Sequence, residues 1–152
     1  MSEFGGLDLL ALFSQEVEGQ VVVLNEGLIE LERDPATADI DALMRAAHSI
    51  KGAARIVGLD VAVDLSHAME DVFLAASSGT VTVAAKHVDV LLRGVDILEQ
   101  STQAESTSLK EWLDERREPI ATVTAEIRAL ATGAVPTTAI PPDPGIPSAQ
   151  VE

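Results

Sequence analysis

Apolar residues recur at every third or fourth position along the amino-terminal part of the chain, and this period limits the fold more than any other feature. They are Leu10, Phe13, Val17, Val21, Leu24, Leu28 and Leu31. Such spacing gives an α-helix one apolar face, and glutamates occupy positions between. Asp34 and Pro35 end the period, because the residue before a proline disfavours helical geometry. We therefore expect a long amphipathic helix of about 25 residues from Leu7, with residues 1–6 frayed.

The same period returns in four shorter stretches, which are about residues 37–57, 60–77, 80–98 and 108–130. Residues that cap helices stand at the starts of the first three: Thr37 or Asp39, then Asp60, then Thr80 or Thr82. No stretch alternates apolar and polar residues as a strand would. Consecutive helices with short turns predict an all-α fold, an antiparallel four-helix bundle with an additional fifth C-terminal helix.

Glycine and proline mark where these helices should end or break. Gly58 can take the left-handed conformation that ends a helix. Pro119 lies inside the last helix and should kink or split it, because proline lacks a backbone N–H. Residues 133–152 contain five prolines and no helical period. We expect residues 1–132 to form one helical-bundle domain and residues 133–152 to be a Pro-rich disordered tail or an interdomain linker.

The composition argues against several classes of protein. The 152 residues carry a formal charge of −15, which repels nucleic acid and anionic lipid. The absence of cysteine excludes a disulfide scaffold, a thiolate metal site and a cysteine nucleophile. No apolar run is long enough to cross a membrane, and the amino terminus lacks the basic region of a secretory signal. We expect a cytoplasmic protein that binds no nucleic acid and does not insert into a membrane.

An unusual stripe of residues follows the outer face of the helix expected at residues 37–57. The core face of that helix is formed by Ile40, Leu43, Ala47, Ile50, Ala54 and Val57. At 100° per residue His48 points away from this face, and Lys51, Gly52 and Arg55 continue its stripe. Glycine inside a helix costs about 1 kcal/mol relative to alanine. Something has to offset that cost, and close approach of another surface is the usual reason.

The run His48-Ser49-Ile50-Lys51-Gly52, with small residues after it and Gly58 beyond, resembles the phosphorylation motif of histidine-containing phosphotransfer (Hpt) domains. A second motif of the same family is matched by residues 65–71. The chain is most similar to the amino-terminal phosphotransfer domain of chemotaxis-type histidine kinases, over roughly residues 7–130. The resemblance implies a helical bundle in which an exposed histidine carries a phosphoryl group.

The resemblance also implies roles for four positions. His48 would accept the phosphoryl group. Glu70 would accept the Nδ1 proton of His48, which orients the ring and leaves Nε2 as the nucleophile. Lys51 would hold Glu70 and offset charge on the incoming group, and His67 would join this network as a neighbour of Glu70.

The partners follow from the same resemblance. An ATP-binding histidine kinase domain, in the same chain or another, would phosphorylate His48, and an aspartate of a response-regulator receiver domain would take the group. Gly52 would let a partner's active site close over the imidazole. Arg55 is less standard for the family, so its role stays open, but we expect it in the partner surface because it lies on the same stripe as His48. The chain has no glycine-rich nucleotide loop and no kinase motif, so we expect no cofactor here, with ATP and Mg²⁺ on the partner domains. It would be the phosphoacceptor domain of a larger histidine kinase, or alternatively a free-standing phosphotransfer protein, and in both cases substrate and carrier more than enzyme.

Two other classes of protein remain as alternatives. An acidic helical adaptor would bind partners through its charged faces without transferring phosphate. A di-metal bundle needs Glu-x-x-His on two helices, whereas this chain has a single reversed copy, from His67 to Glu70, so we expect no metal. Uptake of acid-labile, base-stable phosphate separates the phosphotransfer domain from the adaptor, and metal analysis tests the third class.

Overall fold

The computed structural model describes residues 2–132, and the tail or linker expected at residues 133–152 lies outside the described residues. The described part is all-α and contains no strand, which confirms the predicted fold class. Its helices are α1 (Ser2–Arg33), α2 (Ile40–Val57), α3 (Asp60–Ser77), α4 (Ala85–Ser101), α5 (Leu109–Glu115) and α6 (Arg117–Ala131). A short 3₁₀ turn, Ser106–Ser108, precedes α5.

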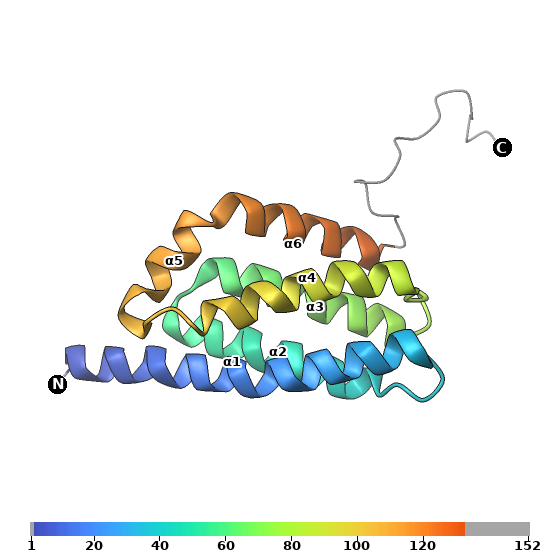
Figure 1. The fold of residues 1–152 in the computed structure, drawn as a ribbon, viewed down its shortest axis with the longest axis horizontal. Helices are drawn as coiled ribbons and strands as arrows, with labels where there is room; N and C mark the ends of the chain where they lie inside the picture. Colours follow the sequence, from blue (N-terminus) through green and yellow to red (C-terminus); the bar gives the residue numbers. More distant parts are fainter. Residues whose placement is uncertain (1, 133–152) are drawn as a thin grey trace, which may run out of the picture.

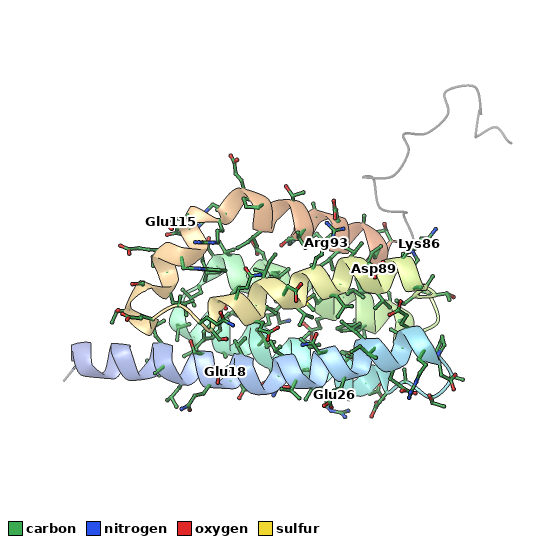
Figure 2. The ribbon with its side chains drawn as sticks, viewed as in Figure 1. Glu18, Glu26, Lys86, Asp89, Arg93 and Glu115 are labelled. Atoms are coloured by element: carbon green, nitrogen blue, oxygen red, sulfur yellow. The ribbon has the colours of Figure 1, made fainter. Side chains whose placement is uncertain are left out.

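Four long helices, α1 to α4, form the bundle, and α6 packs against α3 and α4 on one side of it (Figure 1). The core between them is apolar, and its largest fully buried side chains include Leu24, Leu43, Ile50, Phe73 and Leu91. Charged side chains such as Glu18 and Glu26 of α1 point outward (Figure 2). None of the helices in residues 2–132 is long and apolar enough to cross a membrane.

Two glycines allow helices to approach closely. A Cβ at Gly27 of α1 would lie 2.6 Å from Leu43 Cδ2 of α2, and one at Gly94 of α4 would lie 2.9 Å from Ile127 Cδ1 of α6. Both distances are shorter than ordinary packing contacts. The α4–α6 contact also has an ion pair, in which Arg93 lies 2.8 Å from the buried carboxylate of Glu126. These positions therefore fix how α1 lies on α2 and how α6 lies on α4.

Several predicted helix boundaries are confirmed. Asp39 caps α2 by accepting the N–H of Ala42 at 3.0 Å, and Gly58 ends α2 in the left-handed region at φ 74°. The helix expected at residues 108–130 is split into α5 and α6. Pro119 lies in the first turn of α6, where a helix needs no N–H from it. At the break, the Arg116 guanidinium stacks 4.3 Å above the Trp112 ring.

Three helix starts differ from the prediction. Helix α1 begins at Ser2 instead of Leu7, since extending an existing helix is much easier than starting one. Asp60 does not cap α3: Leu59 holds the cap position, and the Asp60 carboxylate pairs with Arg117 of α6 at 3.3 Å. Neither Thr80 nor Thr82 starts α4, which begins only at Ala85.

The late start of α4 has a local cause. Val83 lies in the non-helical segment before α4 and is buried in the core. The first turn is then closed by His87, whose Nδ1 accepts the N–H of Ala84 at 2.9 Å. The ring of His87 thus helps to cap α4, where neither threonine does.

Candidate functional site

His48 lies on the outward face of α2, with 66% of its side chain exposed. Its core-facing neighbours Ala47 and Ile50 are fully buried, and this packing fixes the direction in which His48 projects. The ring reaches toward α3, where His48 Nδ1 lies 2.7 Å from Glu70 Oε2. The two residues meet because α2 and α3 pack side by side.

Glu70 has a second contact on its other carboxylate oxygen. Lys51 Nζ lies 2.6 Å from Glu70 Oε1, as an ion pair and without the alignment of a regular hydrogen bond. Both side chains are mostly covered, with 12% of Lys51 and 16% of Glu70 exposed. Lys51 therefore holds Glu70 from the same helix that carries His48.

The protonation state of the pair follows from these contacts. Burial by itself would raise the pKa of Glu70, but its contacts with Lys51 and His48 outweigh burial and keep that pKa below its ordinary value. An ionised carboxylate can only accept, so Nδ1 of His48 carries the proton and donates it to Glu70. Glu70 contacts Nδ1, so the other ring nitrogen, Nε2, has a free lone pair when the ring is neutral.

His67 does not join this network in the structure, which corrects the expectation. Its Nε2 lies 3.6 Å from Asp71 Oδ1, one turn along α3, and both side chains are about half exposed. No contact between His67 and Glu70 occurs within the described residues. Glu70 turns toward α2 instead, because Lys51 and His48 are the groups that pair with its two oxygens.

Gly52 and Arg55 lie on the open side of α2. A Cβ built at Gly52 meets nothing within 4 Å, so no neighbouring side chain of the described residues needs a glycine there. Arg55 is exposed, and its guanidinium has no ion-pair partner among the described side chains, those of residues 9–105 and 107–132. The sequence predicted that both residues face outward, and the structure places them so.

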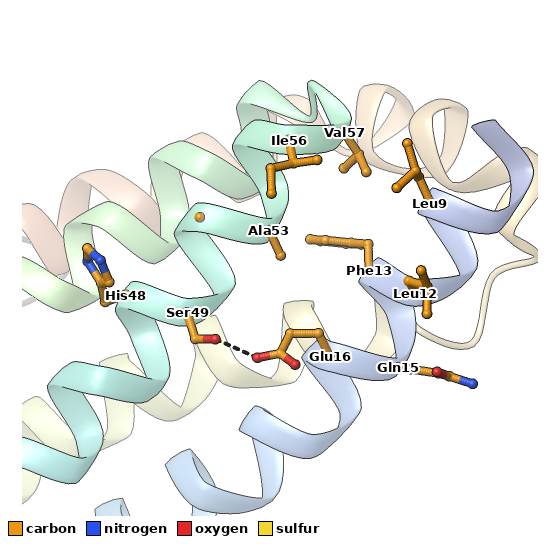
Figure 3. Close-up of a pocket in the computed structure, with 11 residues that line it drawn as sticks. Leu9, Leu12, Phe13, Gln15, Glu16, His48, Ser49, Ala53, Ile56 and Val57 are labelled. Carbon is orange, nitrogen blue, oxygen red and sulfur yellow. Dashed lines mark hydrogen bonds between the residues drawn. The ribbon is translucent and has the colours of Figure 1, made fainter. Parts of the chain in front are cut away.

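A groove of about 770 Å³ lies between α1 and α2 next to His48 (Figure 3). Its walls are mainly apolar, and the apolar residues that line it are Leu9, Leu12, Phe13, Ala53, Ile56 and Val57. Leu12 and Ile56 are 57% and 74% exposed, which is unusual for large apolar side chains. His48, Ser49 and Gly52 border the same groove.

Sequence reasoning missed one polar contact in this groove. Ser49 Oγ donates a hydrogen bond to Glu16 Oε2 (Figure 3), and Gln20 donates to the same oxygen at 2.9 Å. The Ser49 bond, then the Gln20 bond, lower the pKa of Glu16. The contact joins α1 to the residue that follows His48, and only the register between the two helices could have revealed it.

Metal ligands are not clustered in the described part of the chain. No group of three or more His, Cys, Asp or Glu side chains within residues 2–132 is placed to hold an ion.

Residues 8–118 match the family of Hpt domains. The chain belongs to the Hpt family. The match includes α2 and α3, and so covers His48, Lys51 and Glu70. Such a domain is a phosphotransfer module, and several of the relatives of this chain are chemotaxis proteins.

Those relatives are much longer proteins. The chain is 36% identical to the chemotaxis protein CheA of Borreliella burgdorferi over 61% of this chain and 11% of that protein. It is 34% identical to CheA of Rhizobium meliloti over 85% of this chain and 17% of that protein. It is also 34% identical over 90 residues to a gliding motility regulatory protein of Myxococcus xanthus. The chain thus spans less than a fifth of these relatives, and no solved structure is a significant match to it.

Proposed function

We propose that His48 is the phosphoacceptor of this Hpt domain. The observation that carries the proposal is the 2.7 Å contact between His48 Nδ1 and Glu70 Oε2, with Lys51 on the other oxygen. It holds the proton on Nδ1 and directs the lone pair of Nε2 outward from an exposed ring. The arrangement resembles the acidic residue that orients the histidine of a hydrolase triad.

The proposed reaction has two steps. In the first, Nε2 of His48 attacks the γ-phosphorus of ATP held by a kinase domain. The bond to the bridging oxygen breaks, and ADP leaves with the electron pair. Glu70 offsets the positive charge that the ring gains. In the second step, a carboxylate oxygen of a receiver aspartate attacks the phosphorus, the P–N bond breaks, and the electron pair returns to Nε2. Mg²⁺ would belong to the partner domains in both steps.

The kinase and receiver partners are supported by the relatives. One relative is the sensor histidine kinase CheAY of Helicobacter pylori, 36% identical over 76 residues. Several others are chemotaxis proteins. We therefore propose that the chain serves a chemosensory phosphorelay, as a donor to a response-regulator receiver domain. Because the first step consumes ATP, the proposed place of the reaction is the cytoplasm.

Gly52 supports close docking of these partners. Nothing within the described chain packs at the position of its missing side chain, so the cost of about 1 kcal/mol for glycine in a helix is not offset by internal packing. A partner's active site that closes over His48 would offset it. The apolar groove beside His48 offers additional surface for the same contact.

The test compares the three histidines of the chain. With a kinase domain and radiolabelled ATP, we expect acid-labile, base-stable label on the wild-type protein and none on His48→Gln. His67→Gln and His87→Gln are the matched controls and should keep most of the label. The His48→Gln protein should stay folded, because an exposed side chain adds little to packing. Wild-type labelling of His48→Gln would refute the assignment, and a wild-type protein that binds the kinase domain but takes up no label would favour the adaptor.

A further inference from the structure

The phosphoryl group needs a cation that Lys51 does not fully supply. A phosphorylated side chain carries about −1.5 to −2 charges at neutral pH. The Lys51 ammonium is only 12% exposed and lies 2.6 Å from Glu70 Oε1, so its charge is already paired. The chain as a whole is strongly acidic, with a formal charge of −15. A second cation next to His48 would therefore matter more here than on a neutral protein.

Arg55 is placed to be that cation. It follows His48 by seven residues, two helical turns, so the two side chains leave α2 within about 20° of each other. Side chains on a helix lean toward its amino terminus, so Arg55 leans over the turn that contains Gly52 and toward His48. The space above Gly52 is open. Arg55 is exposed and unpaired within the described residues.

Arg45 is the natural comparison on the same helix. It is also exposed and also lacks an ion-pair partner in the part of the chain that the structure describes. It precedes His48 by three residues, however, so it leans away from the ring, and it is turned by about 60° toward α1. The two arginines thus match in chemistry and exposure and differ in where they point.

We propose, on the basis of the proposed function, that Arg55 binds the phosphoryl group on Nε2 of His48 by reaching across the open position at Gly52. The guanidinium would donate to the phosphoryl oxygens and offset their charge. Gly52 then has a role within the chain itself, because any side chain there would stand between Arg55 and the group it binds.

The test loads the phosphoryl group chemically, so that it does not depend on a kinase. Phosphoramidate donates its phosphoryl group to Nε2, its own P–N bond breaks, and ammonia leaves. In a His67→Gln, His87→Gln background, His48 is the only histidine that can be labelled. The ³¹P chemical shift of the phosphohistidine is then followed against pH, with Arg55→Gln, Arg55→Lys and Arg45→Gln compared with the parent protein.

We expect Arg55→Gln to raise the pKa of the phosphoryl group by roughly half a unit, the size of effect typical of an exposed charge pair. Arg55→Lys should restore most of the shift, and Arg45→Gln should leave the titration unchanged. The other charged groups at the site are Glu70 on α3, Lys51 on α2, and Glu16 of α1, which borders the same groove as His48. In every variant Glu70, Glu16 and Lys51 are kept and His67 is glutamine, so a difference between variants reports on the arginine.

Three outcomes would overturn the inference. They are an unchanged titration in Arg55→Gln, an equal shift in Arg45→Gln, and a His48 that phosphoramidate cannot phosphorylate. The proposed function fails separately, if the wild-type protein accepts the group from phosphoramidate but not from a kinase domain with ATP. In that case the titration would still show whether Arg55 binds the group.

Discussion

The two carboxylate oxygens of Glu70 contact different residues of α2, and each contact has its own effect. Oε2 fixes the proton of His48, whereas Oε1 is held by Lys51. A carboxylate with only one of these contacts would be free to rotate. In the proposed reaction, the reactivity of His48 would therefore depend on the position of Lys51 through Glu70.

Replacement of Glu70 by glutamine should slow phosphorylation without changing the site that is labelled. Glu70→Gln keeps the size of the side chain and removes the charged acceptor. Loss of a charge-assisted hydrogen bond costs about 1.5 to 3 kcal/mol, so we expect a rate roughly ten- to a hundredfold lower. Initial rates of labelling measure this, and Asp71→Asn, the next carboxylate along α3, is the control. A wild-type rate in Glu70→Gln would leave His48 as a solitary acceptor.

The same variant should differ from wild type in how stability depends on pH. Since the folded state lowers the pKa of Glu70, its ionised form stabilises the fold above the ordinary carboxyl pKa. That contribution is lost as the pH falls through the folded pKa, where a protonated Glu70 resembles glutamine. The difference in unfolding free energy between the two proteins should thus be largest near neutral pH and vanish in acid. Denaturant titrations at several pH values would measure it, and a constant difference would show that Glu70 does not titrate differently on folding.

At the scale of single residues, the sequence predicted some contacts and missed others, for a clear reason. His48, Lys51 and Glu70 lie on stripes that helical periodicity defines, so their approach follows once α2 packs on α3. The preference of His67 for Asp71, and the bond from Ser49 to Glu16, depend on side-chain direction and on the register of α1 against α2. Neither is encoded in the period of a single helix.

At the scale of elements, Gly19 and Gly27 of α1 have different surroundings. A Cβ at Gly27 would lie 2.6 Å from fully buried Leu43, whereas one at Gly19 meets nothing within 4 Å. Gly19→Ala should stabilise the protein by about 0.5 to 1 kcal/mol, the usual helical gain. Gly27→Ala should destabilise it, because overpacking costs about 1 to 3 kcal/mol and exceeds that gain. Thermal or urea unfolding of the two variants compares them directly, and equal stabilisation would show that Leu43 can move aside.

The sequence predicted which helices exist better than it predicted where they begin. The period of apolar residues located every long helix, and Pro119 correctly divided the last one. The starts of α3 and α4 depend on tertiary contacts, namely the pairing of Asp60 with Arg117 and the burial of Val83. Where such tertiary contacts form, they outweigh the preference of a residue for capping a helix.

At the scale of the whole molecule, exposed apolar surface gathers around the groove beside His48. We expect Leu12→Ser and Ile56→Ser to weaken transfer to the receiver several-fold, mainly through a higher KM, while labelling of His48 by phosphoramidate stays unchanged. Leu74→Ser is the matched control, since Leu74 is 54% exposed and lies on α3, outside the groove. Transfer kinetics with the cognate receiver measure this. An equal loss in Leu74→Ser would mean that the groove has no special part in docking.

The close contact of Gly27 with Leu43 has a consequence at the opposite end of the same two helices. Phe13 is fourteen residues from Gly27, about 20 Å along α1, and Phe13 lines the groove. Because a packed helix moves largely as a rigid element, a shift of α1 at Gly27 would also move Phe13 and so change the shape of the groove. Close relatives of this domain could diverge in partner preference through a buried residue that no partner ever touches.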